Sequence, residues 1–108
     1  MKFEINNSQW EIIEKNNDEM TILNDCENEK LNGLTEYSTH TIYINKDIID
    51  IELTLYHELT HCFMYVYGHN QFQDTTFTYE DVCEICACSH NLIHKIVEDY
   101  MDKRGLEV

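Results

Sequence analysis

Residues 50–68 read DIELTLYHELTHCFMYVYG, and this stretch decides the fold. Asp50 is a good N-terminal helix cap and Gly68 a good left-handed C-terminal cap, so the stretch predicts a helix over about 50–67. Apolar residues occur on nearly every side of this helix. A helix that is apolar all round is usually buried at the centre of its domain.

The same helix contains His57-Glu58-Leu59-Thr60-His61. Two histidines four residues apart lie one turn apart on the same face, so both imidazoles can reach one ion. Glu58 points about 100° away around the helix axis and can contact a water on that ion without ligating it. Zinc takes neutral nitrogen ligands, and a neighbouring carboxylate can act as a general base. The spacing therefore predicts a zinc site with His57 and His61 as ligands and Glu58 as the base.

A catalytic zinc needs a third protein ligand and one open position. Thr78-Tyr79-Glu80-Asp81 has the spacing of a capping box, which predicts a second, long helix from here to about Lys103. If this helix folds back antiparallel to the first, Glu80 can complete the metal site. Glu84 lies one turn later on the same face, where it can accept the N–H of a ligating imidazole or itself be the third ligand.

This arrangement resembles the zincin metallopeptidases of the gluzincin branch. More narrowly, it resembles the small ImmA/IrrE-type metallopeptidases of phages and mobile elements. Glu80-Asp81-Val82-Cys83-Glu84-Ile85-Cys86-Ala87 is similar to that family's Glu-x-x-Ala-Asn/Asp-x-x-Ala stretch. Cys83 stands where a small residue is usual, and Glu84 where Asn or Asp is usual. The resemblance covers about residues 33–90.

The resemblance implies a zinc peptidase in which Glu58 activates a zinc-bound water toward a peptide carbonyl, with Glu80 as third ligand and Glu84 as its orienting neighbour. It implies a minimal zincin-like domain in which the strand at 40–45 is the edge strand that binds extended peptide. It also implies a peptide or protein substrate, which the same mobile element can encode. Gluzincins steady the oxyanion with a Tyr or His, and the candidates here are Tyr65, Tyr67, His69 and His90.

The rest of the chain predicts an α+β domain over residues 1–108, with a sheet of three to four strands beside the two helices. Phe3 and Ile5 alternate with polar residues and indicate a strand, and residues 33–45 indicate a hairpin. Ser8-Gln9-Trp10-Glu11 has capping-box spacing and predicts a short helix at about 9–17. The remaining segments are predicted to be a strand at 20–23 and polar loops at 25–32 and 69–77.

Charge excludes several function classes. The chain of 108 residues has 7 Lys plus Arg against 21 Asp plus Glu, a formal charge of −14. Nucleic acids and anionic membranes select basic proteins, so neither is an expected partner. The sequence has no apolar run of about 18 residues and no signal-peptide pattern at its start, so the expected location is the cytoplasm.

The alternative to a peptidase is a non-catalytic, zinc-containing acidic binding protein of a phage or mobile element. A purely structural zinc site would have no use for Glu58, which favours catalysis. The cysteines Cys83, Cys86 and Cys88 are expected to be small core residues. A separate site made from them with His90 and His94 is not expected, because the set climbs about 16 Å along a helix.

Overall fold

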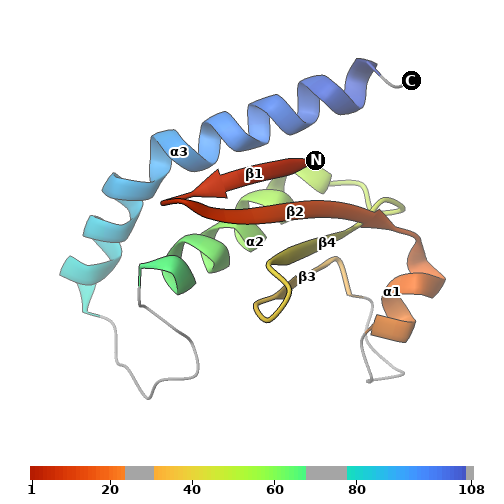
Figure 1. Cartoon of the computed structure of the whole chain (residues 1–108), viewed down its shortest axis with the longest axis horizontal. Helices are drawn as coiled ribbons and strands as arrows, with labels where there is room; N and C mark the ends of the chain where they lie inside the picture. The colour runs from red at the N-terminus through yellow and green to blue at the C-terminus, as the bar shows by residue number, and fades with distance from the viewer. Residues whose placement is uncertain (24–30, 68–77, 107–108) are drawn as a thin grey trace.

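The computed structural model describes residues 1–23, 31–67 and 78–106. Within these ranges a small sheet and helices, one of them long and C-terminal, confirm the predicted α+β class (Figure 1). The elements in chain order are β1 (Lys2–Ile5), β2 (Ser8–Lys15), α1 (Asn17–Leu23), β3 (Gly33–Glu36), β4 (Thr41–Asn45), α2 (Ile51–Val66) and α3 (Tyr79–Leu106).

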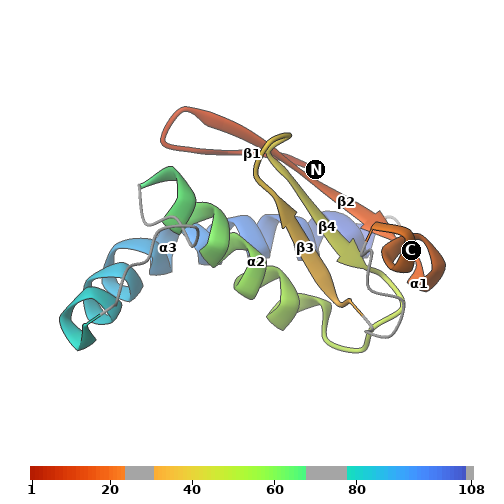
Figure 2. The same ribbon diagram turned by 90° about the horizontal axis from the view of Figure 1, so that it is seen from below.

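The four strands form one mixed sheet in the order β1-β2-β4-β3. The β1–β2 and β3–β4 pairs are antiparallel, and β2 and β4 pair in parallel through the middle of the sheet. Helix α2 packs against β3 and β4, as Figure 2 shows, and also contacts α3. Buried side chains of the sheet, α2 and α3 form one core, which includes Ile5, Trp10, Ile42, Ile44, Leu55, Leu59, Ile93 and Val97.

The helix predicted at 9–17 is wrong, because residues 8–15 form β2. Trp10 and Ile12 are buried with a partly exposed residue between them, which is the two-residue period of a strand. Ser8 does not cap a helix. Its hydroxyl accepts a hydrogen bond from the indole Nε1 of Trp10 at 3.1 Å.

A two-residue turn joins β1 to β2. Ile5 pairs with Ser8, and the intervening Asn6 and Asn7 have φ angles of 47° and 65°. Two consecutive positive φ angles are the requirement of a type I′ hairpin turn, and asparagine tolerates them better than other residues with a side chain. The turn therefore commits residues 8–15 to pair with β1.

The strand predicted at 20–23 is also wrong, since these residues belong to α1. The helix begins with a reciprocal pair of hydrogen bonds. Asn16 Oδ1 accepts from the Glu19 backbone N–H at 2.9 Å, and Glu19 Oε1 accepts from that of Asn16 at 3.2 Å. This is a capping box with asparagine in the place of serine, and it outweighs the apolar character of Met20. The loop predicted at 25–32 lies largely outside the described residues.

The predicted helix α2 is confirmed, and its N-terminal cap is Asp50, whose Oδ1 accepts the Leu53 N–H at 3.0 Å. The helix is not enclosed on all sides, however. Leu53 is 65% exposed and His57 is exposed, so α2 buries one side only. Its buried residues are Ile51, Leu55, Glu58, Leu59, Cys62 and Phe63. Gly68 and the loop predicted at 69–77 lie outside the described residues.

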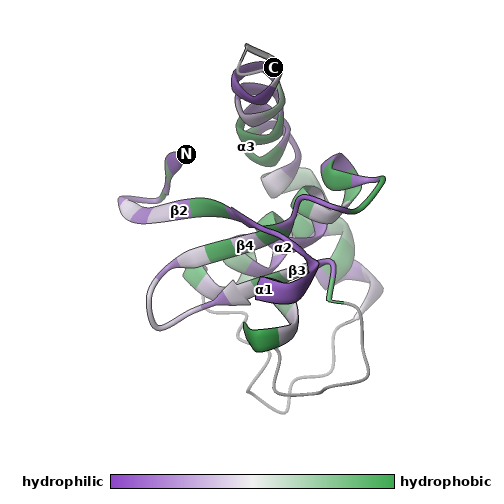
Figure 3. Ribbon diagram, turned by 90° about the vertical axis from the view of Figure 1, so that its right-hand side faces the viewer, coloured by the Kyte–Doolittle hydropathy of each residue, from purple (hydrophilic) through white to green (hydrophobic). Residues whose placement is uncertain are grey.

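The capping box at the start of α3 is confirmed. Thr78 Oγ1 accepts the Asp81 N–H at 3.2 Å, and Asp81 Oδ2 accepts the Thr78 N–H at 3.0 Å. The second half of α3 is amphipathic (Figure 3), and it buries Ile93, Ile96, Val97 and Tyr100. The first half extends past the β1–β2 hairpin (Figure 1), so Val82 and Cys86 are exposed there.

The expectation of buried cysteines is therefore wrong for Cys83, Cys86 and Cys88, which are exposed thiols on α3. Cys62 on α2 is buried as a small core residue. Within the described ranges, no helix is long and apolar enough to cross a membrane.

A polar contact joins the C-terminal half of α3 to the sheet. The Glu14 carboxylate on β2 accepts a hydrogen bond from the Tyr100 hydroxyl and another from Arg104 Nε at 2.7 Å. Partial burial raises the pKa of Glu14, but the hydrogen bonds from Tyr100 and Arg104 outweigh that effect and leave the pKa below its usual value. The ionised carboxylate is thus the form that stabilises this contact.

Glu14→Gln is expected to lower the free energy of unfolding by about 1 kcal/mol at pH 7, because it removes a charge-assisted acceptor that is partly exposed. The folded pKa of Glu14 is lowered, so its contribution is present above the unfolded pKa of about 4.3 and is lost as the pH falls through the folded value. Urea unfolding at pH 7 and near pH 3.5 measures this. Glu4→Gln, on an exposed strand position, controls for net charge. Equal losses in both variants would contradict the assignment.

Candidate functional site

The two histidines of the His57–His61 motif converge on the exposed side of α2. Their Nε2 atoms are 3.2 Å apart, and their rings meet edge to face with centroids 4.9 Å apart. Two zinc–nitrogen bonds of about 2.0–2.1 Å at the tetrahedral angle place the nitrogens about 3.4 Å apart. The pair therefore fits two ligand positions of one zinc ion.

Glu58 lies on the side of α2 that packs against the sheet, and its side chain is buried. Its Oε2 accepts a hydrogen bond from Thr35 Oγ1 of β3 at 2.5 Å. The backbone of Gly33 is close on the same side, because a Cβ built at Gly33 would lie 2.9 Å from Glu58 Cγ and 2.8 Å from Thr54 Cγ2. Strand β3 thus positions this carboxylate by a hydrogen bond and by direct packing.

The edge of the sheet beside α2 is β3 rather than the strand at 40–45. β4 pairs with β3 on one side and with β2 on the other, which leaves β3 at the edge among the described residues. The assignment of the strand at 40–45 as the edge, which the resemblance implied, is therefore wrong, because β2 and β3 occupy the two sides of β4.

A small cavity of about 150 Å³ lies between β3 and α2. Glu58, the predicted base, and His61, one of the predicted ligands, both line this cavity. The other lining residues belong to β3 or follow it: Gly33, Leu34, Thr35 and Tyr37. Sequence reasoning missed the contributions of β3. The available signal was Gly33, since an isolated glycine in a strand pattern indicates a close backbone approach.

Tyr37 is the aromatic residue of this cavity. Its ring stacks on that of Tyr65, with centroids 4.7 Å apart. Burial raises the pKa of Tyr37, and the nearby Cys62 and Glu58 raise it further, so the phenol stays protonated and can donate. Burial likewise raises the pKa of the Cys62 thiol well above its usual value, with Glu58 adding to the effect, so Cys62 packs as a neutral group.

The predicted third ligands are placed elsewhere. Glu80 and Glu84 are both exposed on α3, and Glu84 faces Phe63 and Tyr67 of α2 across a different cavity. Across residues 1–23, 31–67 and 78–106, no group of three His, Cys, Asp or Glu side chains is arranged to hold a metal. The structure therefore brings together His57, Glu58 and His61, but neither carboxylate of α3 with them.

The predicted oxyanion residues are dispersed. The ring of Tyr65 stacks on that of Tyr37 and meets the ring of Trp10 edge to face. Tyr67 lines a different cavity, between α2 and α3. His90 is exposed on α3, and its ring stacks on that of His94. His69 lies outside the described residues. Tyr37, which was not among the predicted candidates, shares a cavity with Glu58 and His61 of the motif.

Comparison with protein-family models, curated proteins and solved structures finds no match to this chain. We therefore infer the function of the protein from the geometry of the site itself.

Gly33→Ala is expected to destabilise the fold by about 1–3 kcal/mol, since the added methyl overlaps Glu58 and Thr54. Gly105→Ala is the matched control, because a Cβ there meets nothing within 4 Å. In a helix this control is expected to be neutral or stabilising by up to about 1 kcal/mol. Urea unfolding of both variants measures the difference. A neutral Gly33→Ala would show that β3 does not pack closely on Glu58.

Proposed function

We propose that this protein is a zinc-dependent peptidase in which His57 and His61 hold the metal and Glu58 is the general base. The observation that carries the proposal is the 3.2 Å separation of the two Nε2 atoms. It is supported by the neighbouring buried carboxylate, which lies beside an edge strand.

Zinc, when bound, lowers the pKa of the water it holds to about 7 and so supplies a nucleophile at neutral pH. Glu58 Oε2 is held by Thr35, which leaves Oε1 to accept the proton of the attacking water. As the water oxygen bonds to the peptide carbonyl carbon, Glu58 takes this proton and passes it to the leaving nitrogen when the C–N bond breaks. Both products then carry intact valences, and Glu58 is ionised again.

The substrate is an extended peptide or a protein segment, and it lies along β3. An edge strand offers unpaired backbone groups to an extended chain, and this one borders the cavity that contains Glu58 and His61. Tyr37 reaches the same cavity with a protonated phenol, a donor suited to the oxygen of a peptide carbonyl. We assign it the role for which Tyr65, Tyr67, His69 and His90 were candidates.

Glu80 is the proposed third ligand, and Glu84 the alternative. This part of the proposal comes from the resemblance to zincins, where a glutamate at the start of the following helix completes the site. Both side chains are exposed near the start of α3, which connects to α2 through residues 68–77.

The second candidate function is that of a zinc-containing binding protein without turnover. One observation favours it: Thr35 already engages the Glu58 carboxylate. In this function Glu58 anchors α2 to β3 and takes no part in chemistry.

Zinc per chain after supply of zinc and removal of excess is expected to be about one for the wild type. His57→Ala is expected to lose it, while His94→Ala, an exposed histidine of α3, keeps it. Elemental analysis measures this. Glu80→Ala is expected to lose zinc and Glu84→Ala to keep it; the opposite result makes Glu84 the ligand. A wild-type protein without zinc would refute both proposed functions.

Glu58→Gln is expected to retain zinc and the Thr35 hydrogen bond, and to lower peptide cleavage about a hundredfold or more, because the amide cannot accept the proton. The probe is a library of peptides from digested, denatured proteins, with new termini identified by mass spectrometry. Glu52→Gln, an exposed position on the same helix, is the control and is expected to cleave normally. Cleavage by Glu58→Gln at the wild-type rate would refute the catalytic role. Zinc without cleavage in the wild type would favour the binding protein.

A further inference from the structure

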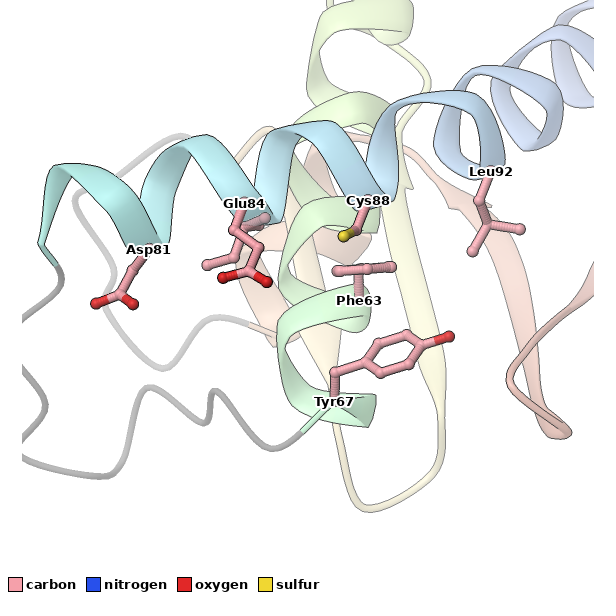
Figure 4. A pocket seen from close by; sticks show the side chains of 7 residues that line it. Phe63, Tyr67, Asp81, Glu84, Cys88 and Leu92 are labelled. Atoms are coloured by element: carbon pink, nitrogen blue, oxygen red, sulfur yellow. The ribbon is translucent and has the colours of Figure 1, made fainter.

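A second cavity, of about 370 Å³, lies between the C-terminal turns of α2 and the first half of α3. Figure 4 shows Phe63 and Tyr67 on one side, with Cys88 and Leu92 on the other. Among the described residues it shares no lining residue with the cavity beside His61. Its volume falls within the range of about 300–1,000 Å³ that is typical of ligand sites.

The cavity is apolar within and acidic at one end. Phe63, Ile85 and Leu92 supply apolar walls, and the carboxylates of Asp81 and Glu84 extend from the neighbouring turns of α3 (Figure 4). Asp81 also caps α3. Residues 79–94 contain three acidic residues and neither lysine nor arginine, so this part of the helix is acidic.

The charge of the whole chain narrows the choice of occupant. A second copy of this chain would bring together two formal charges of −14, and its 7 basic residues are outnumbered by 21 acidic ones. Like-charge contacts oppose association, whereas a basic partner is attracted and guided to the surface. An apolar cavity bordered by carboxylates is complementary to a segment with an apolar side chain beside lysine or arginine.

We propose that this cavity docks a basic segment of a protein partner. The segment inserts one large apolar side chain between Phe63 and Leu92, and it places a lysine or arginine against Glu84. Buried apolar anchors supply most of the affinity of such sites, and charges at the edge supply attraction and orientation. The proposal depends on neither zinc nor peptide cleavage.

The test uses a fluorescein-labelled amphipathic leucine–lysine peptide of about 15 residues, which is long enough to form a helix of several turns. Anisotropy is measured with EDTA present, so that metal content does not contribute. Cys88→Phe fills the cavity and is expected to weaken binding about tenfold. Cys83→Phe adds the same ring to the same helix at an exposed residue that does not line the cavity, and it is expected to bind as the wild type does.

A second pair of variants tests the charges without filling the cavity. Glu84→Lys is expected to weaken binding about tenfold and to reduce its salt dependence. Asp102→Lys makes the same change of charge at an exposed position near the other end of α3 and is expected to have a small effect. Equal binding by Cys88→Phe and Cys83→Phe, or equal losses in the two lysine variants, would overturn the proposal. Equal binding by the two phenylalanine variants would mean that the cavity does not hold the peptide. Equal losses in the two lysine variants would mean that the peptide responds to net charge alone.

Discussion

A carboxylate that is removed from water has to be held by hydrogen bonds and by close packing, and here Glu58 is held where α2 meets the edge strand β3. Thr35 donates to it, and Gly33 leaves room for its methylene groups. This contact sets how α2 is rotated about its own axis. Because His57 and His61 lie about a quarter turn from Glu58, their side chains emerge beside β3 on the open side of the helix.

Local signals were enough to predict the elements that carry the motif. Asp50 caps α2, the Thr78 capping box opens α3, and the two β-rich segments of residues 33–45 form the predicted hairpin. Ser8 has the same local spacing as a capping residue, yet the preceding Asn6-Asn7 turn decides its conformation. As a strand, residues 8–15 lie between β1 and β4, which leaves β3 rather than β4 at the edge beside α2.

The rest of the site depends on contacts between segments distant in the chain. Thr35 meets Glu58 across 23 residues, and no periodicity in either segment encodes that meeting. The exposed thiols of α3 illustrate the same limit. A helical pattern predicts that α3 is long, but it carries no information about where the sheet ends. The first half of α3 extends past the β1–β2 hairpin, and Cys86 is exposed there.

The contact between β2 and the far end of α3 also constrains the order in which the protein can fold. Glu14 is separated from Tyr100 by 86 residues and from Arg104 by 90. During synthesis, the N-terminal hairpin leaves the ribosome long before the helix that covers its apolar face. Contacts of such long range close late and slow the folding reaction. Until α3 has emerged, the core that these strands belong to lacks Ile93, Ile96, Val97 and Tyr100, so the nascent chain presents an incomplete apolar core to chaperones through most of its translation.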